Sequence, residues 1–218
     1  MFEQPTLDRK RKIEALYPEP SNNNNFVEKR PRIMLTDSSW VDQFRIPDCL
    51  ALTKTEFEEL WNMKPDTRET VKMFGKTFSA PRWSITFGRS YFYAGVKHEA
   101  KPLTPVISRL MDWCKMRSPT LNGALVNFYE SGLDNIGQHS DNEKSIISES
   151  EIYSLSFGAT RKMHFHSKKG GPVQETISLE DKTLIVMGGQ CQQTHNHSVP
   201  LTKQKTGRRI NITFRSFQ

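Results

Sequence analysis

The chain of 218 residues has the length of one globular domain with a tail to spare. Its 31 lysines and arginines outnumber its 24 acidic residues, and the formal net charge of +7 favours a polyanionic partner such as nucleic acid over an acidic or apolar one. Scattered cysteines, the lack of a secretory signal and the lack of a long apolar run exclude a disulfide scaffold and a membrane helix, so we expect an intracellular protein.

Residues 1–35 are predicted to form a flexible basic tail, because they contain too few apolar side chains to offset the entropy lost on ordering. The clusters RKRK (9–12) and KRPR (29–32) are 16 residues apart, a layout that resembles a bipartite nuclear import signal. A solvated tail or a nonspecific phosphate anchor would show the same composition. We therefore expect nuclear residence, with the cytoplasm as the alternative, and a globular domain at 36–218.

Two amphipathic helices are predicted in the first half of this domain. Segment 52–63 begins with a capping box in which Thr53 is the N-cap and Glu56 follows three residues later. Segment 104–117 places three apolar side chains on one helical face: Val106, Leu110 and Trp113. We expect both helices to have structural roles.

The second half changes to a hydrophobic period of two, which predicts short strands. The predicted strands are 124–129, 151–158, 161–168, 174–180, 183–188 and 208–217. Many short strands joined by glycine-rich turns indicate a β sandwich or jelly roll.

The segment IGQHSDNE contains His139 and Asp141, two positions apart. In a strand such positions point the same way, so the imidazole and the carboxylate can converge while Ser140 faces elsewhere. One histidine and one carboxylate make up two thirds of the facial triad of non-haem Fe(II) oxygenases. By itself the pair is also common on protein surfaces.

Two further pairs offer the missing histidine. His164 and His166 lie in MHFHSK, and His195 and His197 lie in QTHNHSVP. Both pairs have the same strand geometry, and their pattern alone does not choose between them.

The C-terminal strand GRRINITFRSF separates polar from apolar side chains. Its polar face carries Arg209, Asn211, Thr213 and Arg215, and its apolar face carries Ile210, Ile212 and Phe214. If the apolar face packs on the core, two guanidiniums enter the same space, and their burial is costly without an anion. A dicarboxylate such as 2-oxoglutarate would satisfy one of them by bidentate pairing. The alternative is a polar face exposed to water.

The segment NFY places Asn127 and Tyr129 on one strand face, where an amide and a phenol can hydrogen-bond a carboxylate. Ordinary polar strand residues would show the same pattern.

In chain order, the elements NFY, HSD, SLSFGATR, HSVP and RINITFR resemble those of the AlkB family of Fe(II)/2-oxoglutarate dioxygenases, especially its nucleic-acid-repair members. The resemblance covers roughly residues 75–218. It implies an α+β, mainly β fold: a double-stranded β-helix (jelly roll) core with supporting helices and an N-terminal nucleotide-recognition lid at about 71–99. It also implies Fe(II), the co-substrate 2-oxoglutarate, and O2.

The resemblance assigns the catalytic metal ligands as His139, Asp141 and His197, so that His164 and His166 have an auxiliary or surface role. It assigns the 2-oxoglutarate pocket to five residues: Asn127, Tyr129, Arg209, Asn211 and Arg215. Within that pocket Arg209 would hold the distal carboxylate and Arg215 would lie near the metal-bound end.

Segment 80–95 resembles the family's lid, which implies substrate contacts by Arg82, Tyr91 and Tyr93. Tyr93 would stack on the target base opposite His139, an interaction worth about 1–3 kcal/mol. Glu143 matches an acidic position beside the metal, where it would accept a hydrogen bond from an exocyclic amino group and favour a cationic base. Without the resemblance, the aromatic cluster would be read as core packing. Asn142 departs from the family, in which an acidic residue often follows the metal aspartate.

The implied function is oxidative demethylation of N-alkylated bases, such as 1-methyladenine and 3-methylcytosine, in DNA and/or RNA. The base is restored with release of formaldehyde, succinate and CO2, and we expect the enzyme to be a monomer. Two alternative functions are a 2-oxoglutarate oxygenase acting on protein or a small molecule, and a non-enzymatic nucleic-acid-binding protein.

Overall fold

The computed structural model describes residues 28–73, 76–93 and 96–218, with the backbone alone at 71–73, 76–77, 92–93 and 96–97. Of the predicted tail at 1–35, residues 1–27, which include the basic cluster at 9–12, lie outside these residues. The sheet begins before the predicted domain start at residue 36, because strand β1 spans Ile33–Thr36 and Lys29 already bridges to Phe44. Leu35 is buried, whereas its neighbours Met34 and Thr36 are exposed. This alternation is too short to predict a strand from the sequence of a charged segment.

A seven-stranded antiparallel sheet forms the larger layer of the molecule, in the order β1-β2-β13-β10-β15-β8-β5. Besides β1, its strands are β2 (Ser39–Arg45), β5 (Trp83–Phe87), β8 (Gly123–Tyr129), β10 (Ile152–Gly158), β13 (Thr183–Gly189) and β15 (Arg209–Arg215). Strand β15 lies between β10 and β8, so neighbours satisfy its backbone on both sides.

A four-stranded antiparallel sheet, in the order β12-β11-β14-β9, forms the second layer. Its strands are β9 (Ile136–His139), β11 (Arg161–Ser167), β12 (Glu175–Leu179) and β14 (His195–Val199), and the short helix α4 (Cys191–Thr194) leads into β14. One apolar cluster joins the layers, with Ile185 and Met187 from the larger sheet and Phe165 and Ile177 from the smaller one. The predicted jelly roll, mainly β with supporting helices, is confirmed.

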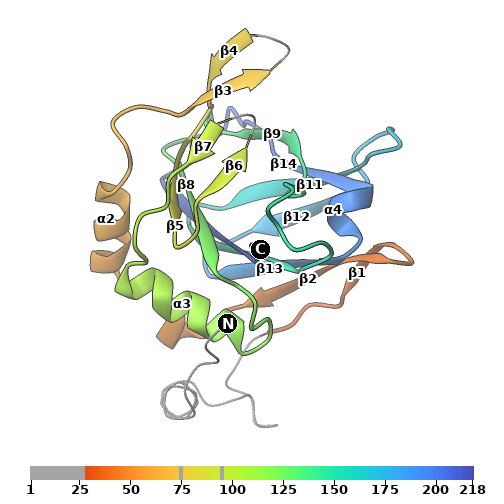
Figure 1. Cartoon of the computed structure of the whole chain (residues 1–218), viewed down its shortest axis with the longest axis horizontal. Coiled ribbons are helices and arrows are strands. Elements are labelled where there is room, and N and C mark those ends of the chain that lie inside the picture. Colours follow the sequence, from red (N-terminus) through yellow and green to blue (C-terminus); the bar gives the residue numbers. More distant parts are fainter. Residues whose placement is uncertain (1–27, 74–75, 94–95) are drawn as a thin grey trace.

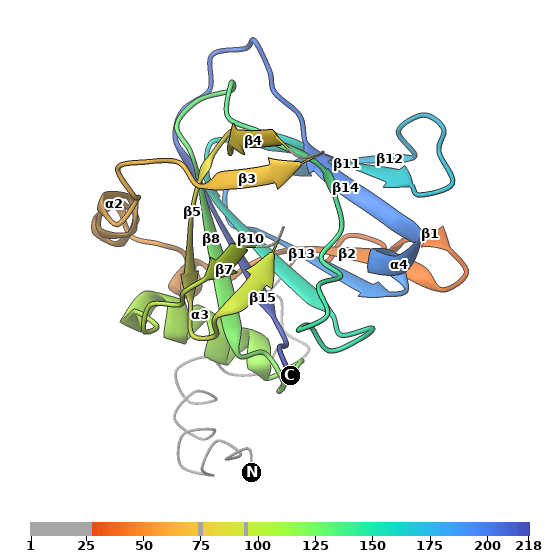
Figure 2. The ribbon, with the colours of Figure 1, turned by 45° about the horizontal axis from the view of Figure 1, so that its top comes forward.

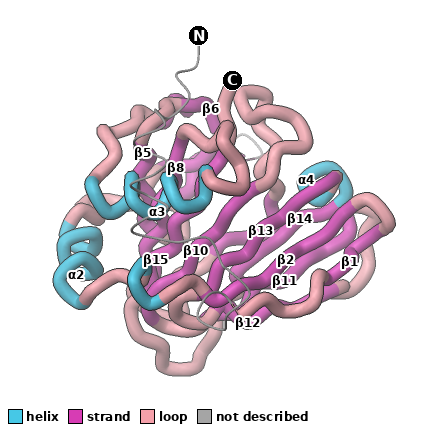
Figure 3. The backbone as a smooth tube through the Cα atoms, turned by 90° about the horizontal axis from the view of Figure 1, so that it is seen from below, coloured by secondary structure: helices cyan, strands magenta, loops and turns pink. Residues whose placement is uncertain are grey.

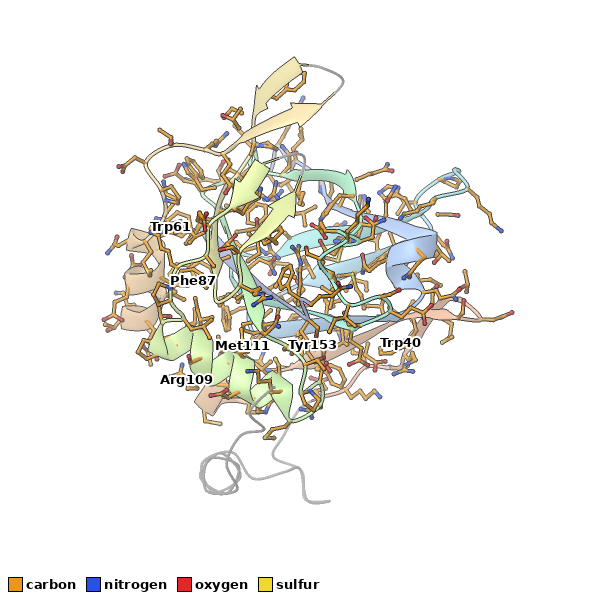
Figure 4. The ribbon with its side chains drawn as sticks, in the orientation of Figure 1. Trp40, Trp61, Phe87, Arg109, Met111 and Tyr153 are labelled. Carbon is orange, nitrogen blue, oxygen red and sulfur yellow. The ribbon has the colours of Figure 1, made fainter. Side chains whose placement is uncertain are left out.

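Two helices cover the outer face of the larger sheet, α2 (Lys54–Asn62) and α3 (Pro105–Lys115) (Figure 3). Thr53 and Glu56 form the predicted capping box of α2, and Thr104 caps α3 with a proline in its first turn. Figure 4 labels Trp61, Phe87 and Met111 in the apolar cluster between helices and sheet. The 3-10 turn η1 (Asp48–Leu50) connects β2 to α2.

Two hairpins fall in the predicted lid region at 71–99, β3 (Thr70–Met73) with β4 (Lys76–Ser79), and β6 (Tyr91–Tyr93) with β7 (Val96–His98). Both stand at one end of the sandwich (Figures 1 and 2). Within the described part of the chain, no helix is both long and apolar enough to span a membrane.

Candidate metal centre and its cavity

Two histidines meet across neighbouring strands of the smaller sheet. His139 ends β9 and pairs in register with His197 of β14, and their ring centroids are 4.2 Å apart. Asp141 follows β9 by two residues. Its Oδ1 lies 3.9 Å from His139 Nε2, and its Oδ2 lies 3.9 Å from His197 Nε2. The three side chains offer ligand atoms that all lie within 4.8 Å of one another. The structure therefore brings together the three predicted metal ligands.

The position of Asp141 depends on contacts that the sequence did not reveal. The strand ends at His139, so the strand geometry expected for the pair does not extend to Asp141. Its backbone N–H instead donates to Gln192 Oε1 over 2.9 Å. Lys168 Nζ donates to Ser140 Oγ and to the Gln192 carbonyl, which ties this loop to α4. Gln192, a buried polar residue on a four-residue helix, is thus a functional candidate without a sequence motif.

The electrostatics of the three residues suit a divalent metal. Burial lowers the pKa of His139, and burial together with the neighbouring His139 lowers the pKa of His197 to about 3, so both imidazoles are neutral at physiological pH. Burial opposes ionisation of Asp141, but the charge of Arg215 beside it holds its pKa below the ordinary value. Two neutral imidazoles and one carboxylate are the donor set that non-haem Fe(II) takes.

The other histidines are committed elsewhere. His166 Nε2 lies 3.1 Å from Ser198 Oγ, and the rings of His164 and His166 are 6.1 Å apart. His195 Nδ1 contacts Thr194 Oγ1 and its Nε2 contacts Gln174 Oε1. In the ranges that the structure describes, the only potential metal-binding group of three is His139, Asp141 and His197.

A cavity of about 190 Å3 adjoins the three residues, and every residue of the predicted 2-oxoglutarate pocket lines it. Arg209 is 1% exposed. Its Nη2 donates to Ser156 Oγ and its guanidinium lies 4.8 Å from the Tyr129 ring, but its Nε and Nη1 find no acceptor among the described side chains and backbone. A buried guanidinium with free donors fits a carboxylate ligand, as 2-oxoglutarate would provide.

The remaining pocket residues come from the paired strands β8 and β15. Asn211 lies opposite Asn127, and Arg209 lies opposite Tyr129. Asn211 Nδ2 donates to Ser154 Oγ and to the Leu155 carbonyl, while Asn127 Oδ1 accepts a hydrogen bond from Arg82 Nε at 2.8 Å. The predicted polar face of β15 is buried, which excludes the alternative in which it faces water.

Arg215 is paired with carboxylates at the metal centre. Arg209 and Arg215 are the first and last residues of β15, about 20 Å apart at the usual rise of a strand, so they do not compete for one space. Arg215 Nη2 lies 2.6 Å from Asp141 Oδ1, and its Nη1 lies 3.8 Å from Glu143 Oε1. Arg215 therefore neutralises the carboxylates beside the histidines, and its predicted contact with 2-oxoglutarate stays a prediction.

The predicted substrate residues Arg82, Tyr91 and Glu143 also line the cavity. Tyr91 is buried and packs between His98 and Phe217, with ring centroids 5.2 Å from each. Glu143 Oε2 is buried and has no hydrogen-bond donor among the described residues, and burial raises the pKa of this carboxyl. The side chain of Tyr93 lies outside the described part of the chain, so its stacking on a base stays a prediction.

Comparison with known proteins agrees with this geometry. Residues 46–215 match the family described as the 2OG-Fe(II) oxygenase superfamily. Mouse "DNA oxidative demethylase ALKBH2" is 35% identical over 66% of this chain and 65% of its own length, and the human protein of that name is 33% identical over 66% and 60%. Rat "Alpha-ketoglutarate-dependent dioxygenase alkB homolog 3" is 34% identical over 72% and 55%. The matched region thus spans less than two thirds of each of these relatives.

A solved structure described as "The structure of OsALKBH1" superposes with a TM-score of 0.58 over 85% of this chain and 100% of that chain. At 15% sequence identity this likeness concerns the fold alone. Membership of the matched superfamily implies Fe(II), 2-oxoglutarate and O2. The three donor side chains and the free nitrogens of Arg209 fit these groups. The chain belongs to the 2OG-Fe(II) oxygenase superfamily and, within it, to the AlkB family.

Proposed function

We propose that this chain is an Fe(II)- and 2-oxoglutarate-dependent demethylase of N-alkylated bases, such as 1-methyladenine and 3-methylcytosine, in DNA and/or RNA. The observation that carries the proposal is the convergence of His139, Asp141 and His197 on one cavity, which Arg209 also lines with two guanidinium nitrogens that lack an acceptor. The names of the mouse and human relatives, both DNA oxidative demethylases, support the choice of nucleic acid.

The bound iron and its co-substrates would supply the oxidation of the N-methyl carbon, which leaves as formaldehyde while 2-oxoglutarate yields succinate and CO2. In this proposal the residues of the chain provide binding and orientation. His139, His197 and Asp141 would hold the ion, since their protonation states already suit it. Arg209 would hold the distal carboxylate of 2-oxoglutarate through the two nitrogens that lack an acceptor.

The base would enter between the hairpins and the metal centre. Tyr91, Glu143 and Arg82 line the cavity. A base with a blocked pairing edge is unstacked more cheaply than an intact one, which favours capture of the alkylated form. The buried oxygen of Glu143 is placed to accept a hydrogen bond from an exocyclic amino group, which adenine and cytosine both carry.

The experiment is an incubation with single- and double-stranded DNA and RNA oligonucleotides, each carrying one methylated base, in the presence of Fe(II), 2-oxoglutarate, ascorbate and oxygen. Mass spectrometry of the oligonucleotides should show loss of one methyl group with the wild-type chain and none with Asp141→Ala. The relative rates then identify the preferred strand and lesion. Succinate formation without demethylation of any oligonucleotide would favour a protein or small-molecule substrate, and binding without succinate would favour a non-enzymatic nucleic-acid binder.

A further inference from the structure

A second carboxylate, Glu69, lines the cavity apart from the metal centre. Its Oε2 accepts a hydrogen bond from Ser84 Oγ at 2.7 Å, and its Oε1 lies 3.2 Å from His98 Nδ1. The side chain of Glu69 is 33% exposed, whereas that of His98 is 8% exposed. Glu69 is thus held in a fixed position with part of its surface open to whatever enters the cavity.

Three separate segments hold this carboxylate in place. Glu69 directly precedes β3, Ser84 belongs to β5, and His98 ends β7. The His98 ring also stacks on Tyr91 at an interplanar angle of 16°, on the side of the cavity where we place the base. His98 and Glu69 both line the cavity, so the contact between them belongs to its wall.

The surroundings of Glu69 favour its charged form. Burial opposes ionisation of Glu69, but the hydrogen bonds from His98 and Ser84 and the charges of His98 and Arg82 bring the pKa of Glu69 below its ordinary value. Arg82 itself donates its Nε–H to Asn127.

We propose that Glu69 is a charge-selecting residue of the base site, whose carboxylate favours a cationic alkylated base over a neutral one. N1-alkylated adenine and N3-alkylated cytosine carry a positive charge, whereas N3-methylthymine is neutral. An anion in a partly desolvated cavity attracts the former and gives the latter no such gain. This inference rests on the proposed function for the nature of the ligand. It adds to the base site a residue that distinguishes bases by their charge.

A purely structural role is the rival reading, because the contacts of Glu69 also tie the start of one hairpin to the end of the other. That role predicts equal losses for cationic and neutral bases when Glu69 is changed. Charge selection predicts a loss confined to the cationic base. The two readings therefore differ in the ratio of affinities and not in either affinity alone.

The test measures dissociation constants by fluorescence anisotropy for matched single-stranded oligonucleotides that carry 1-methyladenine, 3-methylcytosine or N3-methylthymine. Glu69→Gln keeps the shape of the side chain and removes its charge. Glu59→Gln, an exposed carboxylate on α2, is the matched control. We expect Glu69→Gln to weaken binding of both cationic oligonucleotides about tenfold while it changes the neutral one less than twofold. Ser84→Ala keeps the carboxylate and should keep the preference.

Equal weakening for all three oligonucleotides, or no change for any of them, would overturn the inference. So would a wild-type chain that binds cationic and neutral bases equally well. Because the readout is binding, its outcome is independent of turnover. If Glu69→Gln loses the charge preference but the wild-type chain demethylates no oligonucleotide, only the proposed function is refuted. If the wild-type chain demethylates and Glu69→Gln keeps the charge preference, only this inference is refuted.

Discussion

Arg215 Nη2 lies 2.6 Å from Asp141 Oδ1, so the last residue of β15 is ion-paired to the carboxylate of the metal centre. Both side chains are at most 5% exposed. A buried pair of this kind must offset the loss of hydration of two charges by close contact. Strand β15 thereby contributes two arginines to the cavity. Arg209 stands at the start of the strand, and Arg215, the partner of Asp141, stands at its end.

Removal of this partner should be costly for stability. Arg215→Met leaves Asp141 buried without its main counter-charge, and we expect the metal-free chain to lose about 3–5 kcal/mol of unfolding free energy. Urea denaturation followed by circular dichroism measures the change. Arg30→Met, which removes an exposed ion pair with Glu180, is the control and should change stability by about 1 kcal/mol or less. A similar small change for both variants would show that the buried pair contributes little.

The metal-free chain should become less stable as the pH falls from about 6.5 toward 3. Burial and the neighbouring His139 hold the pKa of His197 at about 3, below its ordinary value of 6.5. Over this range the unfolded chain takes up a proton at residue 197 that the folded chain refuses, so stability falls with pH. His139, His164 and His195 have lowered pKa values and act in the same direction.

Urea midpoints measured with a chelator present between pH 7.5 and 4.5 test this dependence. His197→Gln should show a flatter slope than the wild type, because the variant lacks one of the histidines that titrate differently in the two states. A wild-type midpoint that stays constant or rises toward acid pH would contradict the assignment of a neutral, buried His197.

Gln192 should matter for metal affinity although it offers no ligand to the ion. Its Oε1 accepts the backbone N–H of Asp141, so Gln192→Ala releases the loop that carries the carboxylate. Loss of such an outer contact commonly reduces metal affinity about 10–100-fold. Isothermal titration of the metal-free chain with Mn(II) measures the affinity, and the exposed neighbour Gln193→Ala should bind as the wild type does. Equal affinities for both variants would remove Gln192 from the site.

Arg209 should control the affinity for 2-oxoglutarate. Arg209→Lys keeps the positive charge but loses the planar fork, two of whose nitrogens lack an acceptor among the described residues. We expect the dissociation constant for 2-oxoglutarate, titrated in the presence of Mn(II), to rise about tenfold or more. Arg208→Lys, next to it and paired with the exposed Glu58, should leave the constant unchanged. If Arg209→Lys binds 2-oxoglutarate normally, another residue holds the distal carboxylate.

The sequence predicts much of the fold because its signals are local. The alternation in β15 defines which side chains face the core, and Ile210, Ile212 and Phe214 are indeed fully buried. The capping box at Thr53 marks the start of α2 correctly. The list of predicted strands omits five strands of the two main sheets: β1, β2, β5, β9 and β14. Strand geometry was assumed only for the histidine pairs in β9 and β14. Strands β2, β5 and β14 bury most of their residues on both faces, and β1 and β9 have only four residues each.

The site depends on long-range register that no local pattern contains. The residues alone left two histidine pairs open, and the pairing of His197 with His139 across β14 and β9 is what brings His197 to Asp141. The ion pair of Arg215 with Asp141 joins residues 74 positions apart. Gln192 and Glu69 have no motif, because each acts through hydrogen bonds to segments distant in the chain.

The most direct test of the account compares formaldehyde release with methyl loss from one oligonucleotide carrying 1-methyladenine, at saturating Fe(II), 2-oxoglutarate and oxygen. The wild-type chain should release one formaldehyde for each methyl group lost, and Asp141→Ala should release none while it still binds the oligonucleotide. A wild-type chain that leaves the methyl group in place, or an Asp141→Ala variant that removes it at the wild-type rate, would contradict the assignment of His139, Asp141 and His197 as the iron site of a base demethylase.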